Sequence, residues 1–209
     1  MVIVAQVLFV VLGAAWLVTR PLMRGQAAEI RAELIPRLVI AGCILLVLAL
    51  SLAGPLLSPR LAWPAVKGRI AKEFPSVKRV STTELAKELD LRERPVLLDV
   101  RTAAEFEISH LSGAQHVDPE AAASEVKLAK DAPIVTYCSV GYRSARFAER
   151  LEKAGFRSVR NLEGSIFQWA NEGRPLVNAR GPATAVHPYD RKWGTLLDEL
   201  RRAKVPDAK

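Results

Sequence analysis

The feature that most constrains this chain is the apolar run 134–137, which ends directly at Cys138. Its β-branched and aromatic residues are typical of a buried strand. A short loop follows, and a helix is predicted over residues 144–154. The cysteine therefore stands where a strand gives way to a helix, which requires a fold that combines both kinds of element.

This position favours a reactive thiol. Cys138 would face the unpaired N–H groups of the first helical turn and the positive end of the helix dipole. Arg143 adds a fixed positive charge. Both effects stabilise the thiolate, the form that attacks sulfur. We therefore interpret Cys138 as a candidate nucleophile.

Helix and strand signals alternate from Ser81 onward. Capping boxes at Ser81 and Thr102 each predict the start of a short helix, and the apolar run 95–100 predicts a strand buried on both faces. Further strands are predicted over 115–117, 133–137 and 158–162, and further helices over 121–128, 144–154 and 166–171. The fold class is therefore α/β, with a mostly parallel sheet flanked by helices. In such sheets ligands bind at the carboxyl ends of the strands, where Cys138 falls.

Two apolar stretches without charged residues precede this region. Residues 1–19 and 38–57 are each long enough to cross a bilayer, so we predict two transmembrane helices joined by a basic connecting loop over 20–37. A signal peptide is the alternative for the first stretch, but its basic residues follow the apolar run instead of preceding it. Cys43 lies inside the second stretch and is interpreted as a packing residue of a membrane helix.

A basic juxtamembrane segment over 58–79 follows the second stretch. Val66, Ile70 and Phe74 recur at helical spacing, which suits either a helix at the lipid headgroups or a linker whose apolar residues pack on the next domain. The attraction of a basic flank to the anionic cytoplasmic leaflet favours a cytoplasmic soluble domain.

The charge and the cysteine count exclude several classes of function. The formal charge is +8, but the basic residues cluster beside the apolar stretches, so we expect the lipid bilayer and not nucleic acid as the partner. Cys43 and Cys138 are the only cysteines, and one soluble cysteine with three histidines does not make a metal site. We expect no metal and no cofactor.

Four segments in order resemble motifs of the rhodanese family, over residues 80–178. Leu98-Asp99-Val100-Arg101 with Glu105-Phe106 resembles "DVR…E[FY]", and 109–114 resembles "GHIPGA" with serines at 109 and 112. The run 138–144 resembles the active-site loop "CxxGxR[ST]". The segment 162–175 resembles "L.GG…W…G.P", with Ser165 in place of the second glycine. The resemblance implies a rhodanese domain with sulfurtransferase activity.

Loop length separates two chemistries. Four residues lie between Cys138 and Arg143, whereas phosphatases that resemble this fold have five in the corresponding loop. The shorter loop favours a single sulfur atom on Cys138 over a tetrahedral phosphate.

The predicted reaction is a two-step transfer through a persulfide on Cys138. A small donor such as thiosulfate gives up its outer sulfur, and cyanide or a thiol accepts it. The substrate-binding loop is Ser139, Val140, Gly141, Tyr142 and Arg143, whose N–H groups would hold the persulfide. Asp99, Arg101 and His110 are predicted to be structural supports, and His116 and His187 have no neighbouring groups that suggest a role.

Two alternatives remain at this stage. The domain would be a persulfide relay that docks a protein partner without turning over a small donor, or a scaffold that has lost activity. The C-terminal tail, 179–209, carries an apolar stripe at helical spacing that predicts one amphipathic helix. The residues of that stripe are Trp193, Leu196, Leu197 and Leu200.

Overall fold

The computed structural model describes residues 34–35, 37–48 and 62–205, which belong to two units divided after Ser58. In the first unit, residues 37–48 are helical, and their large apolar side chains are exposed within that unit. The predicted span 1–19, nearly all of the loop 20–37 and the rest of the second span lie outside the described residues. None of the helices that are described combines the length and the hydropathy of a membrane span.

The second unit is built on a five-stranded parallel sheet, which confirms the predicted fold class. Its spatial order is β1-β5-β4-β2-β3, so β4, the strand that leads to Cys138, is central. A central parallel strand has partners on both edges and helices on both faces, which explains why all four of its residues are buried. The strands are β1 (Lys78–Val80), β2 (Val96–Asp99), β3 (Gln115–His116), β4 (Ile134–Tyr137) and β5 (Val159–Leu162).

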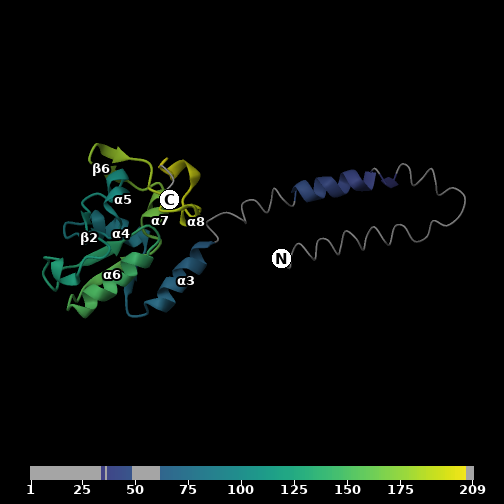
Figure 1. Ribbon diagram of the computed structural model, residues 1–209. Helices are drawn as coiled ribbons and strands as arrows, with labels where there is room; N and C mark the ends of the chain where they lie inside the picture. Colours follow the sequence, from purple (N-terminus) through teal and green to yellow (C-terminus); the bar gives the residue numbers. More distant parts are fainter. Residues whose placement is uncertain (1–33, 36, 49–61, 206–209) are drawn as a thin grey trace, which may run out of the picture. The chain divides into compact units, whose positions relative to one another are not determined.

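Helices cover the sheet on two sides (Figure 1). On one side α6 (Tyr142–Lys153) and Ile70 of α3 (Trp63–Glu73) share a core cluster with Leu98 and Ile134 of the sheet, whereas Trp63 of α3 belongs to the cluster on the other side. On the other side α4 (Thr82–Leu89) and α7 (Ser165–Asn171) share a cluster with Leu97 and Val135. Successive strand residues alternate between the two clusters, as the pleat of a strand requires.

The two predicted capping boxes are confirmed. Ser81 and Glu84 exchange side chain to backbone hydrogen bonds at the start of α4, and Thr102 and Glu105 do so at the start of α5 (Ala103–Ile108). Each box satisfies N–H groups that a helix start leaves unpaired.

The predicted helix over 121–128 is wrong. Only a 3₁₀ turn, η2 (Ala123–Glu125), forms there. Ala121, Ala123, Val126 and Leu128 all pack against one core cluster. Residues at this spacing point in different directions around an α-helix, so a helix would take some of them out of the core.

The segment before the sheet packs on the domain. Trp63 and Ile70 of α3 are buried, as is Phe74, which ends it. The structure therefore has the arrangement in which the apolar residues of this segment cover the domain that follows.

The single helix predicted for the tail is also wrong. The strand β6 (Leu176–Asn178) precedes the tail and pairs with its first strand, β7 (Gly181–Ala183). The tail then contains the short helix α8 (Arg191–Gly194) and the turn η3 (Glu199–Arg201). Leu197 is buried but Leu200 is 95% exposed. The Asn171 side chain binds the carbonyl of Leu196 and the N–H of Asp198, which takes these backbone groups out of any helical ladder.

Candidate active site

Cys138 lies one residue beyond β4, at the carboxyl edge of the sheet, and is only 1% exposed. Its sulfur accepts a hydrogen bond from the N–H of Gly141 at 3.2 Å. Gly141 has φ +111°, a conformation that residues with a Cβ rarely adopt, so glycine is what lets the backbone turn its N–H toward the sulfur. The loop thus curls around the thiol as the sequence predicts.

The helix α6 begins directly after Gly141, earlier than predicted. Its first-turn N–H groups have no acceptor within the helix by the geometry of any helix start, and Cys138 precedes this end. The position of the thiol at the positive end of a helix is therefore as expected from the sequence.

A second helix start holds the backbone of the cysteine. The N–H of Cys138 donates to Ser165 Oγ at 3.2 Å, and that hydroxyl donates to the carbonyl of Leu162 at 3.1 Å. Two N–H groups of α7, those of Ile166 and Phe167, donate to the carbonyls of Cys138 and Ser139. The cysteine is therefore held both by its own loop, through Gly141, and by the start of α7.

Ser165 occupies a strained conformation, with φ +49°. It stands where the family motif has its second glycine, and a left-handed backbone costs a residue with a Cβ of the order of 1 kcal/mol. Its hydroxyl is the part of the side chain that binds the Cys138 backbone. This substitution therefore adds a polar support for the cysteine at the expense of backbone strain.

The Arg143 side chain is held in place mainly by the carboxylate of Glu105. Its guanidinium makes two hydrogen bonds to the Glu105 carboxylate, at 2.7 and 2.9 Å, and a third to Ser139 Oγ at 3.0 Å. Ser139 Oγ in turn donates to Glu105 at 2.8 Å. Two residues of the loop are thus fastened to one carboxylate on α5.

The Arg143–Glu105 ion pair is weakly screened by water because the Glu105 side chain is almost fully buried, at 2% exposure. Burial opposes its ionisation, but the hydrogen bonds and charge of Arg143, with further bonds from Thr102 and Ser139, lower the pKa of Glu105 to about 2. For Arg143, burial lowers the pKa, but the Glu105 bonds and the nearby Cys138 raise it, and the net direction is upward. The Arg143–Glu105 pair is fully ionised at neutral pH.

Val140 and Tyr142 both pack against other parts of the domain. Val140 is 6% exposed and belongs to a core cluster. The Tyr142 hydroxyl donates to the Glu73 carboxylate, and its ring meets Phe74 edge-on with centroids 5.4 Å apart. The segment that precedes the sheet therefore covers this side of the loop.

Asp99 and Arg101 form the ion pair that the sequence suggests. Both side chains are completely buried, with Arg101 Nη2 2.6 Å from Asp99 Oδ2. Arg101 also donates to the carbonyl of Ser109 at 2.6 Å. The pair ties the end of β2 to the turn that begins at Ser109, which is a supporting arrangement.

Two of the three histidines bond to backbone carbonyls. His110 Nδ1 lies 3.0 Å from the carbonyl of Phe106, with the two rings stacked at 3.8 Å, and His116 Nε2 lies 2.8 Å from that of Arg101. His187 differs from what the sequence suggested, because it lies within electrostatic reach of Glu105, Arg101 and Arg143.

Sequence reasoning missed three residues near the loop. Glu105 stands in a quoted motif and a capping box, but neither pattern shows that its carboxylate also binds Arg143. Ser165 had a signal, since it replaces a glycine. Tyr189 had none, because its ring reaches Arg143, with 4.7 Å to the centroid, through the fold of the tail. In the part of the chain that the structure describes, no cluster of three or more His, Cys, Asp or Glu side chains is placed to hold a metal ion.

The parallel sheet and the cysteine loop define an α/β protein with a buried thiol at a strand-to-helix junction. Residues 81–172 match the family described as "Rhodanese-like domain". The chain is 33% identical over 109 residues to a sulfurtransferase of Allochromatium vinosum, covering 50% of this chain and 99% of that protein. It is 34% identical over 101 residues to the thiosulfate sulfurtransferase GlpE of Pseudomonas putida, covering 48% and 91%. The chain belongs to the rhodanese-like family.

The similarity to a longer relative is confined to part of that protein. The chain is 36% identical over 99 residues to the probable adenylyltransferase/sulfurtransferase MoeZ of Mycobacterium tuberculosis. The match covers 46% of this chain but only 25% of MoeZ, so the chain spans about a quarter of that relative's length.

Proposed function

We propose that the protein is a sulfurtransferase that carries a sulfane sulfur as a persulfide on Cys138. The observation that carries the proposal is the Gly141 N–H bonded to the Cys138 sulfur, in a loop held by the Glu105–Arg143 pair. A rigid loop with an N–H donor aimed at sulfur suits a bound sulfur anion. The sulfurtransferase names of two relatives, which the chain covers almost completely, support the same activity.

In the first step the Cys138 thiolate attacks the outer sulfur of thiosulfate. A bond forms between the two sulfur atoms, the bond inside thiosulfate breaks, and sulfite leaves with its electron pair. The product is a persulfide on Cys138, and backbone N–H groups of the loop stabilise the negative charge on its outer sulfur. Covalent catalysis of this kind divides one transfer into two easier displacements.

In the second step a nucleophile takes the outer sulfur. Cyanide or a thiolate attacks it, the bond between the two sulfurs breaks, and Cys138 leaves as a thiolate. Arg143 acts through the loop, since Glu105 and Ser139 occupy its guanidinium. Its role is to hold the N–H groups in place while charge moves between the two sulfurs.

The test is thiocyanate formation from thiosulfate and cyanide by the full chain. We expect turnover in the wild type and none in Cys138→Ser, with the same circular dichroism spectrum. A folded wild-type protein without turnover would contradict the small-donor mechanism and favour the relay. Phosphate release from a phosphotyrosine peptide without sulfur transfer would contradict the loop-length argument.

We also propose that the two apolar stretches anchor the protein in a membrane, with the rhodanese domain on the cytoplasmic side. The sequence supports this through the length of each stretch and the basic segment that follows the second. Because Cys138 is buried, the test uses Thr184→Cys, an exposed position, in a Cys43→Ser background. A membrane-impermeant maleimide should label this cysteine only after the cells are permeabilised. Labelling in intact cells would place the domain outside.

A further inference from the structure

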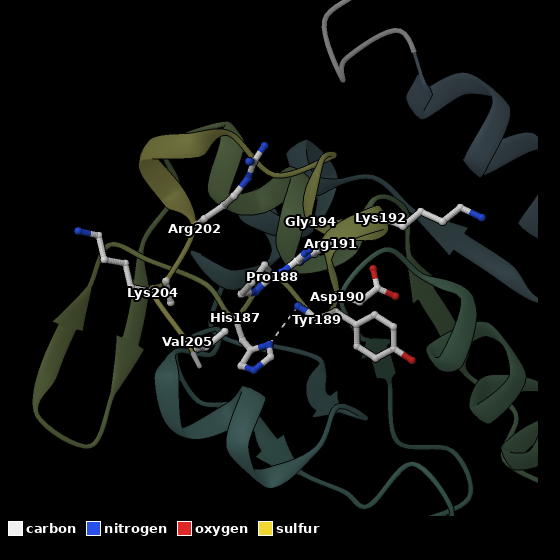
Figure 2. Close-up of a pocket in the computed structure, with 11 residues that line it drawn as sticks. His187, Pro188, Tyr189, Asp190, Arg191, Lys192, Gly194, Arg202, Lys204 and Val205 are labelled. Carbon is white, nitrogen blue, oxygen red and sulfur yellow. Dashed lines mark hydrogen bonds between the residues drawn. The ribbon is translucent and has the colours of Figure 1, made fainter. Parts of the chain in front are cut away.

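The tail forms a cavity that the rhodanese motifs do not include. Its volume is about 730 Å³, and it is lined by residues between His187 and Val205 (Figure 2). Small-molecule sites commonly measure about 300–1,000 Å³, so the volume suits a ligand larger than cyanide or thiosulfate. All of the lining residues lie beyond residue 172, where the match to the family ends.

The cavity adjoins the catalytic loop through one side chain. Tyr189 lines the cavity, and its ring lies over the guanidinium of Arg143, 4.7 Å from Cζ to the ring centre. Cys138 itself does not line it. A ligand in the cavity would therefore have to extend past Tyr189 to reach the sulfur.

The backbone at this junction is held in an uncommon conformation. Tyr189 has φ +67° although it is not glycine, and its N–H donates to His187 Nδ1 at 3.0 Å (Figure 2). Strain of this kind persists only where surrounding contacts impose it, and it is concentrated at functional sites.

His187 presents a hydrogen-bond donor to the cavity. Because Nδ1 accepts the Tyr189 N–H, the hydrogen of the neutral ring is on Nε2. Burial lowers the pKa of His187, and Arg101 and Arg143 lower it further against the opposing effect of Glu105. The ring is therefore neutral at neutral pH.

The charge around the cavity is strongly positive. Four cationic residues line it against one carboxylate, Asp190, which caps α8 through the N–H of Trp193. Figure 2 shows the amines of Lys192 and Lys204 pointing away from each other. A cavity lined by an excess of one sign of charge attracts ligands of the other sign. The four cations are Arg191, Lys192, Arg202 and Lys204.

We propose that this cavity is the acceptor site of the proposed sulfurtransferase and selects a small thiol that carries carboxylates. The inference rests on the proposed function, since it concerns the second step of that reaction. The acceptor's carboxylates lie among the cations and accept from His187 Nε2, while its thiol reaches past Tyr189 to Cys138. The acceptor's thiol first gives its proton to the outer sulfur of the persulfide anion, and the thiolate that results attacks that sulfur. A new sulfur–sulfur bond forms, the bond to Cys138 breaks, Cys138 leaves as thiolate, and the proton stays on the transferred sulfur.

The experiment measures kcat/KM of the full chain with thiosulfate as the donor and two acceptors in turn. These are glutathione and its diethyl ester, which has the same thiol but no carboxylate. We expect a higher kcat/KM for glutathione. In the double variant Lys192→Gln/Lys204→Gln, kcat/KM for glutathione should fall by about twofold to 25-fold, since each exposed charge contributes about 1.5-fold to fivefold in affinity. Activity with the ester and with cyanide should not change.

The matched control is Lys87→Gln/Lys153→Gln, which removes the same charge at two exposed positions outside the cavity lining and should leave all three acceptors unaffected. A second variant, His187→Phe, should raise KM for glutathione while cyanide turnover persists. An unchanged kcat/KM for glutathione in both cavity variants, with cyanide turnover intact, would overturn the acceptor site and leave the proposed function standing. Loss of cyanide turnover in the wild type would overturn both.

Discussion

Replacing Glu105 by Gln tests the brace of the loop most sharply. Glutamine keeps the shape of the side chain and some hydrogen bonds to Thr102, Ser139 and Arg143, but it removes the charge. The pKa of Glu105 falls from an ordinary 4.5 to about 2 in the folded protein. Since one pKa unit corresponds to about 1.4 kcal/mol, the ionised carboxylate contributes about 3 kcal/mol to stability at neutral pH.

The sign of the pH dependence follows from the lowered pKa. This stability is fully present above the unfolded value of 4.5 and is lost as the pH falls toward the folded value of about 2. We therefore expect Glu105→Gln to lower the free energy of unfolding by about 3 kcal/mol at pH 7 but by only about 1 kcal/mol at pH 3. The assay is urea unfolding of the full chain at both pH values, since urea, unlike guanidinium, does not screen the ion pair.

The control is Glu88→Gln, which breaks a pair with Arg160 that is about a quarter exposed on each side. It should cost less than about 1 kcal/mol, because water already screens this pair. The reasoning is refuted if Glu105→Gln costs no more than the control, or if its cost is the same at pH 3 as at pH 7.

Substitutions at three further positions test the groups that hold the cysteine loop and its surroundings, by the same unfolding assay. Asp99→Asn should be strongly destabilising, by about 3–5 kcal/mol, because it leaves the completely buried Arg101 charge unpaired; a loss below about 1 kcal/mol would contradict a buried ion pair. Gly141→Ala should cost about 1–3 kcal/mol from its φ of +111° alone, because the added Cβ meets nothing closer than 3.5 Å; an unchanged midpoint would show that the loop readily adopts another conformation. Both Ser165→Gly and Ser165→Ala remove the hydroxyl, but only glycine relieves the strain at φ +49°, so the glycine variant should be about 1 kcal/mol more stable than the alanine variant.

The part of the fold that carries the chemistry could be predicted from the sequence because its signals are local. The capping residues Ser81 and Thr102 act within one helical turn, and the buried strand before Cys138 is continuous in sequence. The turn at Gly141 is likewise set by one residue type. Patterns of this kind need no knowledge of distant neighbours.

The failures have the opposite character. The tail has helical spacing at Trp193, Leu196 and Leu197, but the side chain of Asn171 binds the backbone there and redirects it. The partner of Arg143 also comes from a distant element. The sequence suggested that the Arg143 charge acts directly on the sulfur, whereas in the structure Glu105 binds the guanidinium. Tertiary hydrogen bonds decided these positions, and no local pattern reports them.

The central claim is that Cys138 carries the transferred sulfur. The most direct test is to incubate the full chain with thiosulfate and no acceptor, and then to measure the mass of the peptide that contains Cys138 together with the sulfite released. The account predicts one added sulfur atom on that peptide, a matching amount of sulfite, and loss of the added sulfur when cyanide is supplied. An unmodified Cys138 peptide in a protein that still forms thiocyanate would contradict it.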